Sequence, residues 1–180
     1  MQKKSRIILN PVNEKYIGRQ PVTERNKTIS HVSRLVDFKN QPMLIRAFAK
    51  VHQKYPEYDL KIYGGDSYDG TKEILEACIR EHSLEKSVHL VGASDNLPEA
   101  IESTAFFAFT SDWEGLPNAL MEAMALGLPV IATDCPCGGP KTIIRHGSNG
   151  HLIPVKNEHA LVEAMYYLIE HPEDANALGT

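Results

Sequence analysis

Two carboxylates, Glu114 and Glu122, stand eight positions apart in a stretch rich in polar and small residues, 110–129. An unbroken helix would offset them by about 12 Å along its axis, too far to share a proton or one compact metal ion. The free amides of a helix N-terminus between them would attract an anion. A ligand with hydroxyl groups at both ends and phosphates in its middle, such as a nucleotide sugar, fits this arrangement. A surface loop with two solvated glutamates is the simpler alternative.

A short helix is predicted to carry Glu122. Pro117 suits its first turn, and Gly127 followed by Pro129 ends it. The apolar residues repeat at helical spacing on one side, which leaves Glu122 on another side together with Asn118. This arrangement predicts that the carboxylate lies near an edge of the protein where a ligand can reach it.

The elements that must position these residues alternate between two periodicities. Short runs with alternating or continuous hydrophobicity predict strands, and apolar residues at i, i+3, i+4 and i+7 predict helices. Strands are expected at 28–32, 60–63, 88–91, 105–109 and 129–133, and helices over 44–51, 71–78 and 161–168, the last beginning near 158, with a turn at 149–150. This order predicts an α/β fold, a Rossmann-like doubly wound parallel sheet flanked by helices. In such sheets ligands bind beyond the carboxyl ends of the strands.

The composition excludes several classes of protein. The 180 residues, 42% hydrophobic and 23% charged, are typical of one globular domain. A net charge of −4 without a basic stripe argues against nucleic-acid binding. No apolar run approaches the roughly 18 residues of a membrane span. The sequence therefore predicts a cytoplasmic chain with no direct membrane span.

Three residue types that often carry chemistry, cysteine, histidine and tryptophan, have structural interpretations here. Cys78 lies on the apolar stripe of a predicted helix, and residues 135–137 form a tight turn because no second ligand pair exists at zinc spacing. His31 is expected to be a hydrogen-bonded strand residue, although it precedes a basic loop. Trp113 is expected to anchor its loop in the core, with a wall of the sugar pocket as the alternative.

Four stretches resemble, in order, motifs of a known enzyme family. Residues 114–122 (EGLPNALME) resemble the E-x7-E motif of the retaining glycosyltransferases of GT-B fold called family 4, or glycosyl transferases group 1. Residues 33–40 resemble the basic loop after the first strand of that family's C-terminal domain, and residues 134–140 and 147–152 resemble two later loops. The resemblance covers about residues 28–170 and implies the C-terminal, donor-binding half of a GT-B fold.

The resemblance implies a role for each matching residue. Arg34 and Lys39 would bind the donor diphosphate and act as catalytic residues with Glu114, which would lie beside the donor sugar. An arginine fork and a lysine charge would stabilise the charge that develops as the glycosidic bond breaks; solvated loop cations are the alternative. Glu122 would bind the ribose hydroxyls. The other implied substrate-binding residues are Gly115, Leu116, Pro117, Asn118, Gly64, Gly65, Gly138 and Gly139.

No metal or other cofactor is expected. The sequence has no D-x-D stretch of the kind with which metal-dependent glycosyltransferases hold a cation on the diphosphate. Arg34, Lys39 and a helix N-terminus would take the place of that cation.

The predicted function is donor binding in a retaining glycosyltransferase. It would move a hexose or hexosamine from a nucleoside diphosphate sugar to a hydroxyl acceptor in cell-surface polysaccharide or lipopolysaccharide synthesis. A UDP-sugar is favoured because residues 134–140 resemble hexosamine transferases, and GDP-mannose is the alternative donor. The alternative functions are a non-catalytic nucleotide-sugar-binding module and one half of a GT-B sugar-nucleotide epimerase.

Residues 1–27 lack periodicity and are expected to form an inter-domain linker that leads into a donor-binding domain at 28–180. The expected partners are the nucleotide sugar, an N-terminal Rossmann-like domain of the same full-length enzyme and, through that domain, an acceptor glycan or lipid-linked sugar. The chain alone is then expected to be an inactive fragment. The full-length enzyme would be cytoplasmic, with a peripheral position at the inner membrane face as one option.

Overall fold

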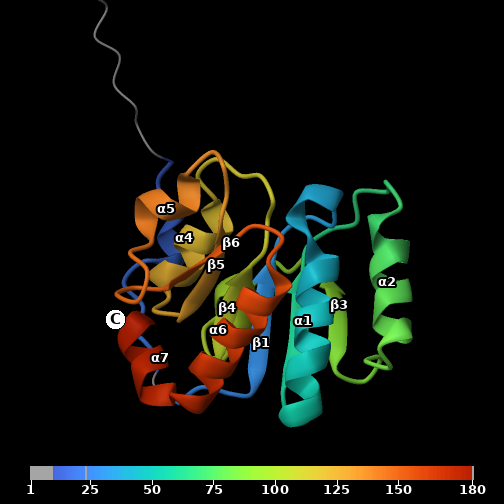
Figure 1. Cartoon of the computed structure of the whole chain (residues 1–180). Helices are drawn as coiled ribbons and strands as arrows, with labels where there is room; N and C mark the ends of the chain where they lie inside the picture. Colours follow the sequence, from blue (N-terminus) through green and yellow to red (C-terminus); the bar gives the residue numbers. More distant parts are fainter. Residues whose placement is uncertain (1–9, 23, 180) are drawn as a thin grey trace, which may run out of the picture.

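The computed structural model describes residues 10–22 and 24–179, and a parallel β-sheet lies at its centre (Figure 1). In this part of the chain the sheet has six strands in the order β3-β2-β1-β4-β5-β6. The strands are β1 (Thr28–Val32), β2 (Asp59–Tyr63), β3 (Val88–Gly92), β4 (Phe106–Phe109), β5 (Val130–Asp134) and β6 (His151–Pro154). The chain winds outward from β1 to one edge and from β4 to the other, which confirms the doubly wound, Rossmann-like fold.

Helices connect successive strands and cover both faces of the sheet. They are α1 (Gln41–Lys54), α2 (Thr71–Glu81), α3 (Leu97–Ile101), α4 (Asn118–Ala125), α5 (Gly139–Ile143), α6 (Glu158–Glu170) and α7 (Pro172–Gly179). Two short 3-10 helices, η1 (Glu14–Tyr16) and η2 (Asp37–Lys39), precede β1 and α1. Figure 1 shows α1 and α6 side by side on one face, and their residues are in contact.

Strand β4 shows how the two faces form two cores. Phe106 and Ala108 belong to the cluster that includes residues of α1, α2 and α6, whereas Phe107 and Phe109 belong to the cluster that includes α4. Successive strand residues point to opposite faces, so a continuous apolar run suits a strand buried on both sides. All four residues of β4 are buried.

The sequence-based elements agree with the structure except in one region. The five expected strands and three expected helices are present, and Asn157 caps α6 by accepting a hydrogen bond from the Ala160 amide at 3.0 Å. The turn expected at 149–150 is present, but residues 151–154, for which the sequence analysis expects no element, form β6 beside β5. This strand ends in a proline and is too short to show a period, so its pairing with β5 defines it.

The described part of the predicted linker packs against the domain. Tyr16 is 1% exposed and belongs to the core cluster on the α4 face. Arg19 forms ion pairs with Glu99 and Glu102, and the Arg25 guanidinium donates a 2.6 Å hydrogen bond to the Gly127 carbonyl. Residues 1–9 and 23 of the predicted linker, and residue 180, lie outside the described residues. The role of the segment as a link between domains stays a prediction.

The buried position of Cys78 and the tight turn at 135–137 agree with the sequence analysis. Cys78 is buried, and a 2.8 Å bond from the Gly138 amide to the Cys135 carbonyl closes the expected tight turn. In residues 10–22 and 24–179, none of the helices combines the length and apolar character that crossing a bilayer requires.

Candidate functional site

A cavity of about 460 Å³ opens beyond the carboxyl ends of β1, β2 and β4. Strands β1 and β4 are the pair from which the chain winds in opposite directions, the point where α/β sheets bind ligands. Most of the predicted site residues surround this cavity. They are Arg34, Lys39, Gly64, Glu114, Leu116, Pro117, Asn118 and Glu122, together with Asn10, Val32, Ser33, Phe109 and Ala119.

The glycine pair after β2 holds the basic loop in place. A Cβ on Gly64, whose φ is +148°, would lie 1.7 Å from the Ser33 carbonyl oxygen. The Leu35 amide donates a 3.0 Å hydrogen bond to the Gly65 carbonyl. Gly64 lines the cavity and Gly65 does not, so a direct nucleotide contact of Gly65 stays a prediction.

A buried hydrogen-bond chain fixes the main chain at Arg34. His31 is fully buried, and burial lowers its pKa to about 4, so its imidazole is neutral at pH 7. Its Nδ1 donates to the Ala108 carbonyl at 2.8 Å, which leaves Nε2 to accept from the Ser33 hydroxyl at 2.7 Å. The Gln41 amide then donates to Ser33 Oγ at 3.0 Å and to the Arg34 carbonyl at 2.9 Å.

This confirms His31 as a hydrogen-bonded strand residue. The supporting residues Ser33 and Gln41 were not identified from sequence, since their partners become neighbours only when the loop has folded.

Lys39 and Glu114 form an ion pair inside the cavity, with side chains 14% and 22% exposed. Three hydrogen bonds tie together the loops that carry them, one of them from the Asn40 side chain to the Asp112 carboxylate at 2.9 Å. The Thr110 hydroxyl donates to the Lys39 carbonyl at 2.9 Å, and the Asp112 amide donates to the Phe38 carbonyl at 2.8 Å. The basic loop after β1 and the acidic loop after β4 therefore form one unit.

Helix α4 presents Glu122 at the other side of the same cavity. Pro117 takes the N-cap position, and Leu120 and Ala123 are buried beneath the helix. Burial raises the pKa of Glu122, and hydrogen bonding to Tyr16 opposes this shift. Burial and the nearby Glu122 carboxylate raise the pKa of the Tyr16 hydroxyl to about 12, so Tyr16 stays protonated and can donate to Glu122.

Residues 10–16, here called the leading segment, therefore contribute to the candidate site. The sequence analysis missed this contribution because residues 1–27 show no period. Asn10 lines the cavity with Glu122. A second cavity, of about 590 Å³, shares Asn118 and Glu122 with the first and is otherwise lined by residues 11–14 and Met121. The two cavities run along the exposed side of α4. Among the lining residues that precede β1, Asn13 carries a local signal, as the N-cap of η1.

The second glycine pair positions the acidic loop. A Cβ on Gly139 would lie 1.5 Å from the Gly115 carbonyl oxygen, so the start of α5 packs directly on the residue after Glu114. Gly138 has a φ of +74° and open space around it. Neither residue lines the cavity, nor does Gly115. Direct donor contacts of Gly115, Gly138 and Gly139 stay a prediction.

Trp113 departs from its expected place. Its side chain is 60% exposed, so the expectation that it anchors the loop in the core is wrong. The backbone bond of Asp112 and the ion pair of Glu114 hold the loop on either side of it. The tryptophan ring is free to project into solvent.

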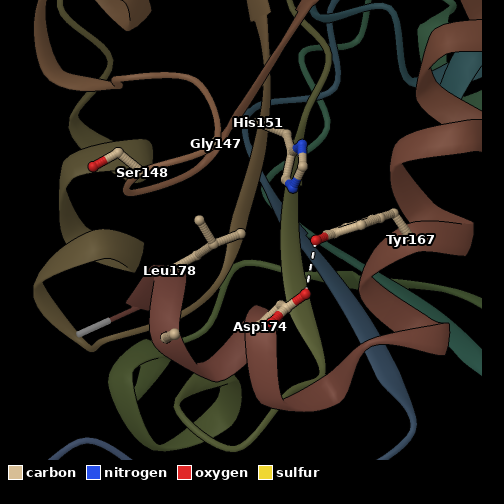
Figure 2. Close-up of a pocket in the computed structure, with 7 residues that line it drawn as sticks. Gly147, Ser148, His151, Tyr167, Asp174 and Leu178 are labelled. Carbon is tan, nitrogen blue, oxygen red and sulfur yellow. Dashed lines mark hydrogen bonds between the residues drawn. The ribbon is translucent and has the colours of Figure 1, made fainter.

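A further cavity of about 330 Å³ lies between the turn before β6, α6 and α7 (Figure 2). The Tyr167 hydroxyl donates to Asp174 at 2.8 Å, and Figure 2 shows the His151 ring pointing toward the same hydroxyl. His151 Nε2 is buried and has no hydrogen-bond partner among the residues that the structure describes, and burial lowers the pKa of this histidine. This cavity contains none of the predicted site residues.

A metal site is not found in residues 10–22 and 24–179, where no group of three or more His, Cys, Asp or Glu side chains could hold an ion. The independence of the reaction from metals and other cofactors stays a prediction.

The fold is that of a Rossmann-like α/β domain of GT-B type. The chain belongs to the family of the glycosyl transferases group 1, whose model matches residues 12–180.

Relatives with known names agree with this membership. The chain is 33% identical over 149 residues to an uncharacterized glycosyltransferase of Haemophilus influenzae, covering 82% of this chain and 41% of that protein. It is 31% identical over 172 residues to an N-acetylgalactosamine-N,N'-diacetylbacillosaminyl-diphospho-undecaprenol 4-alpha-N-acetylgalactosaminyltransferase of Campylobacter jejuni, covering 93% of this chain and 45% of that protein. The chain thus spans less than half the length of these curated relatives.

Solved structures share the fold. Anabaena HepE in complex with UDP superposes with a TM-score of 0.79 at 26% identity, over 87% of this chain and 43% of HepE. The pneumococcal O-GlcNAc transferase GtfA in complex with UDP and GlcNAc gives a TM-score of 0.76 at 28% identity, over 86% of this chain and 31% of GtfA.

Proposed function

We propose that this chain is the donor-binding domain of a retaining glycosyltransferase of family 4. The observation that carries the proposal is the convergence of Arg34, Lys39, Glu114 and Glu122 on one cavity beyond β1 and β4. The rest of the enzyme, including an N-terminal Rossmann-like domain that binds the acceptor, would lie in the part of the relatives' length that this chain does not span.

The two cations hold the diphosphate of the donor in this proposal. Arg34 offers a planar fork of donors and Lys39 a compact charge, and together they stabilise the negative charge that grows on the leaving phosphate. Glu114 accepts hydrogen bonds from the sugar hydroxyls, and Glu122 accepts them from the ribose. The helix N-terminus at Asn118 adds free amides to the same side of the cavity.

Transfer with retention then occurs on one face of the sugar. The bond between the anomeric carbon and the diphosphate oxygen breaks, and the acceptor hydroxyl oxygen attacks the same face of the oxocarbenium-like sugar. The hydroxyl proton passes to the departing phosphate oxygen, so the diphosphate acts as the base. No residue of this chain is required as a nucleophile, because the leaving group stays beside Arg34 and Lys39.

A UDP-sugar carrying a hexose or hexosamine is the favoured donor, with GDP-mannose as the alternative. The HepE and GtfA structures contain UDP, and the Campylobacter relative is named as a galactosaminyltransferase acting on a diphospho-undecaprenol acceptor. These names support a hydroxyl acceptor in cell-surface polysaccharide or lipopolysaccharide synthesis. The cytoplasmic side as the place of the reaction is a further part of the proposal.

Calorimetric titration of the chain with UDP and with GDP tests the donor site. We expect binding of at least one nucleotide, weakened about tenfold or more in Arg34→Ala because a charge-assisted phosphate contact is lost. The matched control is Arg46→Ala, since Arg46 pairs with Glu158 away from the cavity. No binding of either nucleotide, or equal weakening in both variants, would contradict the proposal.

The reaction is tested in the full-length enzyme. Glu114→Gln and Lys39→Ala should each lower turnover sharply, and near wild-type rates in both would contradict the site assignment. Product analysis with and without an acceptor alcohol separates transfer from donor isomerisation and from binding alone. The chain by itself should show no transfer.

A further inference from the structure

The ammonium group of Lys39 is in contact with the carboxylate of Glu114, not with open solvent. A donor diphosphate that binds Lys39 must therefore compete with a carboxylate already at that position. This inference rests on the proposed function and concerns which nucleotides the site prefers.

The charges of the cavity and of the ligand decide how strongly the Glu114 carboxylate opposes phosphate binding at Lys39. Its charged lining residues are Arg34 and Lys39, which are positive, and Glu114 and Glu122, which are negative, so the formal charges cancel. A nucleoside diphosphate released after transfer is more negative than the nucleotide sugar, because its terminal phosphate is no longer esterified. The Glu114 carboxylate repels this product more strongly than it repels the donor.

The backbone keeps Glu114 within reach of Lys39. The carbonyl of Gly115 lies against Gly139, with no room for a Cβ between them. On the other side, the Asp112 amide is bonded to the Phe38 carbonyl at 2.8 Å. A bound nucleotide therefore meets the carboxylate in the cavity and cannot simply displace its loop.

We propose that Glu114 is a specificity-determining residue that favours the sugar nucleotide over the free nucleoside diphosphate. Its carboxylate competes with phosphate for Lys39 in both cases. The hydroxyl groups of a bound donor sugar compensate by donating hydrogen bonds to the carboxylate, whereas the free diphosphate has no such groups there. The same residue thus weakens product binding and assists product release.

The test compares UDP with UDP-glucose and UDP-N-acetylglucosamine in calorimetric titrations of the chain. Glu114→Gln should tighten UDP binding by about two- to tenfold, the range expected for losing one competitor in a partly exposed ion pair. The same variant should leave the affinity for the UDP-sugars unchanged or lower it. The ratio of the two dissociation constants, UDP over UDP-sugar, therefore falls.

Two matched variants isolate the cause. Asp112→Asn removes the same charge from the same loop but outside the cavity, where the Asp112 carboxylate pairs with Lys156 and accepts a 2.9 Å hydrogen bond from the Asn40 side chain, and it should leave UDP affinity near the wild-type value. In a Lys39→Ala background, Glu114→Gln should no longer tighten UDP binding, because the ammonium group for which the Glu114 carboxylate competes is gone. Thermal melting checks folding, and Glu114→Ala is the second neutral variant if Glu114→Gln does not fold.

The inference is overturned if UDP binds no more tightly to the neutral Glu114 variants than to wild type. It is also overturned if Asp112→Asn has the same effect, or if the gain persists without Lys39. Failure of the proposed function looks different, since the wild-type chain would then bind neither UDP nor GDP.

Discussion

The alpha carbon of Gly64 faces the carbonyl oxygen of Ser33 so closely that a Cβ on Gly64 would lie 1.7 Å from it. The contact joins the end of β2 to the start of the basic loop, and the φ of Gly64, +148°, is also unfavourable for any side chain. The position of Arg34 at the cavity depends on this approach of two backbones.

Gly64→Ala is therefore expected to destabilise the chain by at least about 2 kcal/mol, because both backbone strain and the collision with Ser33 must be relieved. It should also weaken UDP binding by displacing the loop of Arg34. Urea denaturation and calorimetry measure the two effects. Gly65→Ala is the control, since no atom lies within 4 Å of its Cβ position; an equal loss in both variants would contradict the explanation.

The pair Gly138 and Gly139 allows a sharper comparison. Gly139→Ala collides with the Gly115 carbonyl and should shift the loop of Glu114, lowering both stability and affinity for a UDP-sugar. Gly138→Ala meets open space and should cost only the roughly 1–2 kcal/mol of a left-handed backbone, with nucleotide affinity unchanged. Similar affinities in the two variants would show that the packing of α5 on Gly115 does not position Glu114.

Substitution of Tyr16 tests whether the leading segment belongs to the folded domain. Tyr16→Ala should lower the free energy of unfolding by about 3 kcal/mol or more, as expected for emptying a buried aromatic site. Ile17→Ala truncates the neighbouring residue, which is 59% exposed, and should change stability by less than about 0.5 kcal/mol. Denaturant midpoints measure both. A loss in Tyr16→Ala as small as that in Ile17→Ala would mean that the segment contributes no packing energy.

His31 should make stability depend on pH between about 4 and 6.5. Its folded-state pKa is lowered to about 4 by burial, below the usual 6.5, so the unfolded chain binds a proton first as the pH falls. The contribution to stability is complete above pH 6.5 and decreases by about 1.4 kcal/mol per pH unit toward pH 4.

The measurement is urea denaturation between pH 5 and 7. His31→Asn should be less stable at pH 7, because the bond to Ser33 is altered, and should lose less stability on acidification than wild type. His159→Asn, at an exposed position on α6, should keep the wild-type slope. An unchanged slope in His31→Asn would mean that other groups cause the pH dependence.

Much of the fold could be predicted because its signals are short-range. The continuous apolar run at 105–109 is consistent with a strand buried on both faces, and α1, α2 and α6 carry their apolar stripes at helical spacing. The E-x7-E segment likewise predicts α4, because Pro117 and Gly127 mark its ends. Strand β6 could not be predicted from local pattern, since four residues ending in proline have no period and depend on β5 for pairing.

The sequence by itself determined the alternation of strands and helices and the residue types available at each strand end, because periodicity and turn chemistry act over a few residues. Tertiary structure alone decided which of these residues meet. Lys39 and Glu114, 75 positions apart, became an ion pair only because parallel pairing of β1 with β4 brought their loops to one edge. The burial of Tyr16 beside Glu122 was decided in the same way, since a segment without period takes its place from the surface that it covers.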